Sequence, residues 1–161
     1  MSLYTQLQQR AADKKPIRVG LIGAGKFGSM YLAQAVRTPG VHLVAIAALN
    51  PAGAKKNLAR VGWTPQQSAA ASSASALRDG NTWITDDWQA LVKLPEIEIV
   101  VECTGSPVHA VDHILAAIAE RKHVVNVTVE ADAFCGPLLA RRAADAGVVY
   151  SLAYGDQPAM I

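Results

Sequence analysis

Cysteine and charged residues are scarce in this chain of 161 residues, and their scarcity excludes several classes of protein. The two cysteines, Cys103 and Cys135, are too few for a disulfide scaffold or a four-cysteine zinc site. Charged residues make up 17% of the chain, the formal net charge is +2, and lysine and arginine form no run longer than a pair. This balance is too mild for a protein that binds nucleic acid.

Long hydrophobic runs are also missing. No apolar stretch reaches the roughly 18 residues that a membrane span needs. The segment 1–15 (MSLYTQLQQRAADKK) lacks the apolar centre of a signal peptide. We therefore expect a cytoplasmic protein with no membrane partner. Hydrophobic residues still make up 51% of the chain, which is enough to bury the core of one domain.

Short apolar segments rich in β-branched residues alternate along the chain with segments of helical spacing. The apolar segments predict buried strands at 17–22, 41–48, 97–103, 123–127 and 148–152, with a short edge strand at 82–85. The segments of helical spacing predict helices at 3–12, 29–38, 51–60, 66–78, 88–94, 107–121 and 132–146. This alternation predicts an α/β fold, a doubly wound and mostly parallel sheet with helices on both faces.

The segment 23–28 (GAGKFG) has the spacing GxGxxG between a buried strand and a helix, the setting in which this pattern binds dinucleotides. Gly23 would permit the tight turn, Gly25 the approach of a pyrophosphate, and Gly28 the close packing of the helix. The helix N-terminus would then direct free N–H groups and a partial positive charge at the phosphates. The alternative is an ordinary strand–helix turn that needs glycine only for its backbone angles.

Lys26 and Phe27 lie inside this loop. We expect both residues to contact the cofactor through their backbone N–H groups, which face the phosphates in sites of this kind. The ammonium group of Lys26 could add positive charge there, or it could be a solvated surface group.

The residues after the second strand bear on the choice of cofactor. NAD-binding proteins usually have a carboxylate there for the ribose 2′-hydroxyl, but this chain has Ala48. Without a carboxylate, a 2′-phosphate meets no repulsion, Asn50 could donate to it, and Lys55 or Lys56 could supply positive charge. This favours NADP over NAD, unless Asn50 only caps the following helix and the lysines are solvated.

Ligands of open α/β sheets lie beyond the carboxyl ends of the strands. The turn after the third strongly apolar strand should therefore face the cofactor, with Thr104 and Gly105 near the nicotinamide ribose. Asn126 and Thr128, at the end of the next strand, could line the nicotinamide pocket. Glu130 could bind substrate, act as a base or stabilise the N-terminus of the following helix, and we favour the helix.

Other reactive side chains are interpreted as structural or solvated. We expect Cys103 and Cys135 to be buried structural residues. His109 and His113 are four apart on one predicted helix, but no glutamate lies between them and no third ligand is nearby. We therefore expect surface histidines and no metal site, and the residues identify no catalytic group.

The segments with the most specific patterns are 18–34 (RVGLIGAGKFGSMYLAQ), 100–110 (VVECTGSPVHA), 122–143 (KHVVNVTVEADAFCGPLLARRA) and 147–158 (GVVYSLAYGDQP). They resemble the homoserine dehydrogenase-like oxidoreductases, and in particular a bacterial subgroup with a C-terminal SAF domain. That subgroup includes reductoisomerase-like enzymes that make 2-C-methyl-erythritol 4-phosphate with NADPH. The resemblance implies an NAD(P)-binding Rossmann domain that serves hydride transfer to or from a small carbonyl or hydroxy metabolite. It carries the family's cofactor contacts onto Gly23, Gly25, Gly28, Thr104 and Gly105.

The resemblance also divides the chain into a helical extension at 1–15, the Rossmann domain at 16–153, and the start of a downstream substrate domain at 154–161. The substrate and the catalytic groups would then depend on that downstream domain, and apolar surface left by it could favour a homo-oligomer. The alternative is a non-catalytic module that senses nucleotides or binds a partner. A methyltransferase is disfavoured by the glycine spacing and by the missing acid after the second strand.

Overall fold

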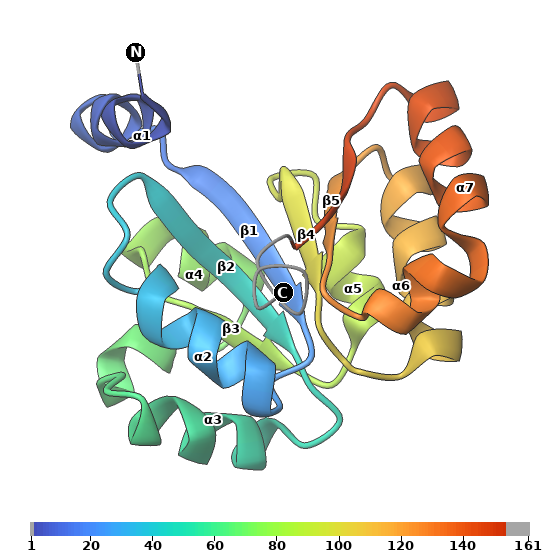
Figure 1. Cartoon of the computed structure of the whole chain (residues 1–161). Helices are drawn as coiled ribbons and strands as arrows, with labels where there is room; N and C mark the ends of the chain where they lie inside the picture. The colour runs from blue at the N-terminus through green and yellow to red at the C-terminus, as the bar shows by residue number, and fades with distance from the viewer. Residues whose placement is uncertain (1, 154–161) are drawn as a thin grey trace, which may run out of the picture.

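The computed structural model describes residues 2–153, so the expected start of a downstream domain at 154–161 lies outside the described residues. Six strands form one parallel sheet in the order β3-β2-β1-β4-β5-β6 (Figure 1). They are β1 (Ile17–Ile22), β2 (Val41–Ala47), β3 (Trp83–Thr85), β4 (Ile99–Glu102), β5 (His123–Asn126) and β6 (Tyr150–Leu152). The strand order reverses direction between β1 and β4, the place where ligands bind in such sheets.

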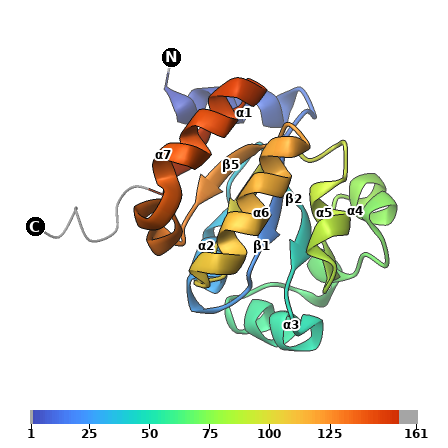
Figure 2. The same ribbon diagram turned by 90° about the vertical axis from the view of Figure 1, so that its right-hand side faces the viewer.

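Helices cover both faces of the sheet, which confirms the predicted doubly wound α/β fold. On one face lie α2 (Lys26–Ala35) and α3 (Pro51–Arg60). On the other lie α4 (Ser73–Asp79), α5 (Trp88–Val92), α6 (Pro107–Ala119) and α7 (Val129–Ala146). Figure 2 is viewed from the side on which α5, α6 and α7 pack.

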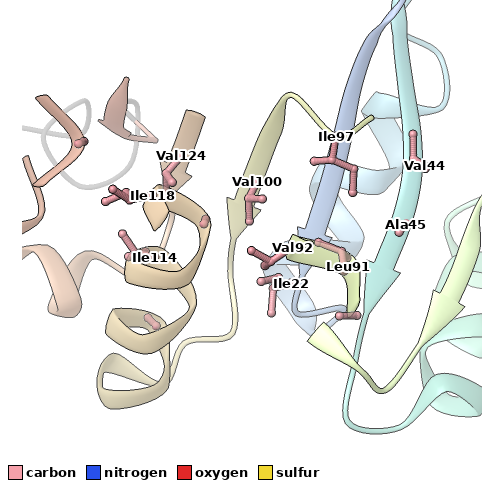
Figure 3. Packing of buried hydrophobic residues seen from close by; sticks show 14 of the residues in the cluster. Ile22, Val44, Ala45, Leu91, Val92, Ile97, Val100, Ile114, Ile118 and Val124 are labelled. Carbon is pink, nitrogen blue, oxygen red and sulfur yellow. The ribbon is translucent and has the colours of Figure 1, made fainter. Parts of the chain in front are cut away.

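Each face of the sheet has its own apolar core. Ile22 of β1, Val92 of α5 and Val100 of β4 belong to the core under α5 and α6, which Figure 3 shows. Leu21 and Ile46 belong to the opposite core under α2 and α3, and neither is exposed. Successive residues of β1 therefore enter opposite cores, which explains why the strand is apolar on both faces.

The segment 66–78 is not the single helix that its alanine and serine content predicts. It forms a 3-10 turn, η1 (Pro65–Ser68), followed by an irregular stretch in which Ala70 pairs with β3, and then α4. Ser72 and Ser75 each accept a hydrogen bond from the other's backbone N–H, so the helix begins only there. Local capping thus overrides the high helix propensity of alanine.

The helices α2 and α7 begin earlier than the apolar spacing predicts, at Lys26 and Val129. The first two residues of each helix are exposed, so they do not belong to the buried stripe whose spacing predicts the helix. α7 is kinked at Cys135, where φ is −143°, just before Pro137. No helix within residues 2–153 is long and apolar enough to cross a membrane.

The predicted helix at 3–12 is confirmed as α1 (Leu3–Ala12), which lies apart from the two helical layers (Figure 1). It packs across the residue before β2, because a Cβ at Gly40 would overlap the carbonyl oxygen of Leu7. Arg10 also forms an ion pair at 3.2 Å with Glu98, the residue before β4. α1 therefore sits at the amino-terminal edge of the sheet, opposite to the carboxyl ends of the strands.

Candidate functional site

The segment 23–28 has two positions at which only glycine fits, one in the loop after β1 and one in the first turn of α2. Gly23 has a φ of +103°, and a Cβ there would lie 2.7 Å from the carbonyl carbon of Cys103. At Gly28, a Cβ would overlap the carbonyl oxygen of Gly23. The loop therefore packs directly against the turn after β4, and α2 packs directly against the loop.

Gly25 is different because it faces open space. It is the N-cap of α2, and a Cβ there would meet no atom within 4 Å. The first N–H groups of a helix have no intrahelical acceptor, so they are free for an anion at this end of α2. Lys26 and Phe27 are both exposed at the same end. The loop thus has the form of a phosphate cradle rather than that of a filled turn.

A cavity of about 310 Å³ lies beside the loop, at the carboxyl ends of β1 to β4. Among the predicted cofactor residues, Gly23, Gly25, Asn50 and Thr104 line it. Most of the remaining wall is apolar, and fully exposed Leu49 belongs to it. An apolar pocket with a few convergent polar groups at this edge of the sheet suits a nucleotide.

Asn50 caps α3 as one of the two alternatives expected, and its donation to a 2′-phosphate stays a prediction. Its side-chain oxygen caps α3 by accepting the Gly53 N–H at 2.8 Å, and the residue also lines the cavity. The lysines of α3 are placed differently: Lys55 lies in a separate hollow beside η1, and Lys56 is exposed outside the cavity wall. Neither lysine therefore lines the cavity, and their contact with a 2′-phosphate stays a prediction.

Asp86 is a cavity residue that the sequence analysis missed. Thr85, the last residue of β3, pairs with Ala47 of β2, and its carbonyl accepts the Ala48 N–H at 2.9 Å. Asp86 therefore follows β3 at the level of Ala48. The Asp86 carboxylate thus lies one strand away from the position where NAD-binding proteins usually have a carboxylate after β2. The position of Asp86 beside the end of β2 follows only from the pairing of β2 with β3, because Asp86 is far from Ala48 in sequence.

Glu102 ends β4, is completely buried, and was given no role from the sequence. Its carboxylate accepts the Thr104 hydroxyl at 2.6 Å, the Thr104 N–H at 3.2 Å and the Thr128 hydroxyl. It also lies 3.3 Å from Nδ1 of His113, which donates when it carries the proton. Burial alone would raise the pKa of Glu102, but hydrogen bonds from His113, Thr104 and Thr128 outweigh it and hold that pKa below its usual range.

Asn126 and Thr128 lie behind the cavity rather than in its wall. They are buried, and the Asn126 side chain accepts the Thr128 N–H at 3.0 Å and donates to the Thr128 carbonyl at 3.1 Å. Thr128 in turn accepts the Gly105 N–H at 3.1 Å, and Gly105 has a φ of +70°. These two residues therefore shape the turn that carries Thr104, while their direct contact with a nicotinamide ring stays a prediction.

The prediction of two surface histidines is half wrong. His109 is exposed, but His113 is buried and lines the cavity floor together with Trp88. Their ring centroids are 4.6 Å apart in an edge-to-face arrangement. His113 faces inward because its neighbours on α6, such as Ala110 and Ile114, are core residues.

The cysteines and Glu130 do not line the cavity, and the prediction that both cysteines are buried is correct for Cys103 and wrong for Cys135. Cys103 is buried, its thiol donates to the Gly23 carbonyl at 2.9 Å, and burial together with the nearby charge of Glu102 raises its pKa to about 12. Cys135 is only half-buried, at the kink of α7. Glu130 is exposed in the first turn of α7, where a negative charge favours the helix N-terminus.

The comparison with protein families gives a match over residues 17–126, to the oxidoreductase family with an NAD-binding Rossmann fold. A comparison with curated protein sequences finds no match.

Several solved structures share the fold. A homoserine dehydrogenase from Thiobacillus denitrificans is 26% identical with a TM-score of 0.68, and the match covers 86% of this chain and 29% of that one. A putative oxidoreductase from Magnetospirillum magnetotacticum is 32% identical with a TM-score of 0.59, over 86% of this chain and 38% of that one. A biliverdin reductase from Synechocystis, solved with biliverdin and NADP+, is 23% identical with a TM-score of 0.59. That match covers 85% of this chain and 37% of the reductase.

The chain thus spans about a third of the length of these solved relatives. The family match includes the glycine loop, both strands that flank the switch point, and the turn after β4. With a phosphate cradle and a cavity at the carboxyl edge of the same strands, the chain belongs to the oxidoreductase family with an NAD-binding Rossmann fold.

Proposed function

We propose that this chain binds a nicotinamide dinucleotide and positions it for hydride transfer to or from a small carbonyl or hydroxy metabolite. The observation that carries the proposal is Gly25, where the backbone opens onto the cavity at the N-terminus of α2. When bound, the dinucleotide would donate the hydride in its reduced form or accept it in its oxidised form, and the protein supplies binding and orientation. The proposed cofactor is NAD or NADP. The preference for NADP stays a prediction, and the negative charge of Asp86 at the cavity wall disfavours it.

The two sides of the cavity have different tasks in this proposal. The N–H groups at the start of α2 hold the pyrophosphate, and Leu49 and Asn50 adjoin the adenosine. Thr104 lies on the nicotinamide side. Its hydroxyl proton is given to Glu102 and one lone pair accepts the Ser106 N–H at 3.3 Å, so its remaining lone pair meets a ligand as an acceptor. Glu102 thereby fixes the orientation of this hydroxyl.

We propose that 16–153 form the cofactor domain of a larger oxidoreductase, with 1–15 as an extension and the catalytic groups elsewhere. The resemblance to the SAF-domain subgroup makes a reductoisomerase-type step in isoprenoid precursor synthesis the first reaction to assay. A small-molecule substrate and self-association stay predictions. Sedimentation of the chain over a range of concentrations tests self-association, and a monomer at every concentration would contradict it.

The binding proposal is tested by calorimetric titration of the chain with NADH and NADPH, using Gly25→Val and a control, Ala140→Val, on the exposed face of α7. Valine at position 25 would project into the cavity, so we expect at least about a tenfold loss of affinity. The free energy of unfolding of Gly25→Val should fall by no more than about 1 kcal/mol, the cost of a poorer N-cap. Ala140→Val should bind like the natural chain.

Two results would contradict the proposal. One is that the natural chain binds neither nucleotide. The other is that Gly25→Val binds as tightly as Ala140→Val, which would make the loop a turn without a ligand.

A further inference from the structure

The charged groups of the cavity wall are unequally distributed. Among the described residues that line it, Asp86 is the one carboxylate, and none is a lysine or an arginine. Asp86 is exposed toward solvent, whereas the carboxylate of the next residue, Asp87, accepts the Ala90 N–H at 2.8 Å and caps α5. The Asp86 carboxylate is therefore available to a ligand, and that of Asp87 is engaged.

The position of Asp86 in the sheet indicates which part of a dinucleotide it meets. The end of β3 is fixed against β2 by the hydrogen bond between the Thr85 carbonyl and the Ala48 N–H, so Asp86 lies beside Ala48. Adjacent strands of a sheet are about 4.8 Å apart. A carboxylate on β3 can thus reach the space that a carboxylate at the end of β2 serves in other dinucleotide sites, the ribose of the adenosine.

We propose that Asp86 accepts a hydrogen bond from the adenosine 2′-hydroxyl and makes this site select NAD over NADP. The inference rests on the proposed function and names the residue, on β3 instead of β2, that sets its cofactor specificity. A 2′-phosphate would place a second negative group against this carboxylate in a largely apolar pocket. Like charges in such contacts disfavour binding strongly.

Two basic groups line a hollow beside the cavity and are absent from its wall. Lys26 and Arg60 line an adjoining hollow, which shares only Asn57 with the cavity among the described residues. The Asn57 side chain is held there by donating to the Ala24 carbonyl at 3.0 Å. A 2′-phosphate that reached Arg60 would have to pass Asn57, and this route is the competing arrangement that the experiment must detect.

The experiment measures the affinities of NADH and NADPH for the natural chain, Asp86→Asn and Asp87→Asn. The two substitutions remove the same charge from adjacent residues, and asparagine at position 87 still caps α5. Adenosine 2′,5′-bisphosphate and 5′-AMP are titrated in parallel, because they probe the adenosine side alone. All variants are checked for folding by thermal unfolding.

We expect the natural chain to bind NADH and 5′-AMP more tightly than their 2′-phosphorylated counterparts. Asp86→Asn should reduce that preference by about tenfold or more, through tighter binding of the phosphorylated ligand and weaker binding of the other. Asp87→Asn should change the preference by less than about twofold, because its carboxylate is directed at the helix.

Three results would overturn the inference while leaving the proposed function intact. They are a preference of the natural chain for NADPH, an equal effect of Asp86→Asn and Asp87→Asn, and an equal weakening of both cofactors by Asp86→Asn, which would place the carboxylate on the adenine. A preference for NADPH that Arg60→Gln abolishes would locate the 2′-phosphate at the adjoining hollow. Binding of none of the nucleotides would overturn the inference and the proposed function together.

Discussion

Two carboxylates at the carboxyl edge of the sheet have opposite surroundings. Asp86 follows β3, is exposed, and lies at the cavity wall. Glu102 ends β4, has no exposed surface, and is surrounded by donors from Thr104, Thr128 and His113. The difference teaches that a carboxylate on the β2–β3 side is left open to the cavity, whereas the carboxylate on the β4 side is used to hold the turn after its strand.

The substitution with the largest expected effect on this contrast is Glu102→Ala. It leaves the Thr104 and Thr128 hydroxyls and His113 without their buried acceptor, so we expect the free energy of unfolding to fall by about 3 kcal/mol or more. Glu130→Ala, an exposed carboxylate on α7, should cost less than about 1 kcal/mol. Urea denaturation measures both. Equal losses in the two variants would show that the network contributes nothing to stability.

The glycine loop repeats the contrast within a few residues. Gly23 has a positive φ and presses on the Cys103 carbonyl, so Gly23→Ala should lower the free energy of unfolding by about 2–3 kcal/mol. Gly25→Ala should cost only about 0.5–1 kcal/mol, because its Cβ enters open space and only the N-cap weakens. Thermal unfolding of the two variants compares them directly. A larger loss for Gly25→Ala would mean that the loop is packed differently.

The smallest expected effect is the pH dependence of the free energy of unfolding. Because the pKa of Glu102 is held below its usual range in the folded protein, its contribution to stability is complete above the unfolded value of about 4.3. That contribution is lost as the pH falls through the folded value. The stability difference between the natural chain and Glu102→Gln should therefore narrow as the pH is lowered from about 5 to 3. Glu130→Gln is the control, and a difference that widens on acidification would contradict this account.

The fold could be predicted from the sequence wherever local signals coincide with tertiary ones. The bounds of α3 were predicted correctly because Asn50 caps the helix and Pro51 begins it. The region after Pro65 was predicted wrongly because pairing of Ala70 with β3 and capping at Ser72 interrupt an alanine-rich helix. Propensity carries no information on such long-range pairing.

The site could be predicted where a segment carries its own signal, as in the glycine loop, at Asn50 after β2 and at Thr104 after β4. The positions of Gly23, Gly25 and Gly28 follow from one strand–loop–helix unit, and the structure gives each of them a physical reason. Asp86 and His113 depend on which strands are neighbours and on which face of α6 is covered. That information arises only when the sheet assembles, so a search along one segment could not find them.

The placement of α1 also decides how binding can be measured. The helix is fixed at the edge where the strands begin, by Gly40 and by the ion pair of Arg10 with Glu98, while Gly25 lies at the other edge. Ser2 and Leu3, at the beginning of this helix, are exposed. A fluorophore or a surface anchor attached there would lie at the opposite edge of the sheet from the cavity, so the proposed nucleotide binding can be measured on a labelled or immobilised protein without obstruction of the site.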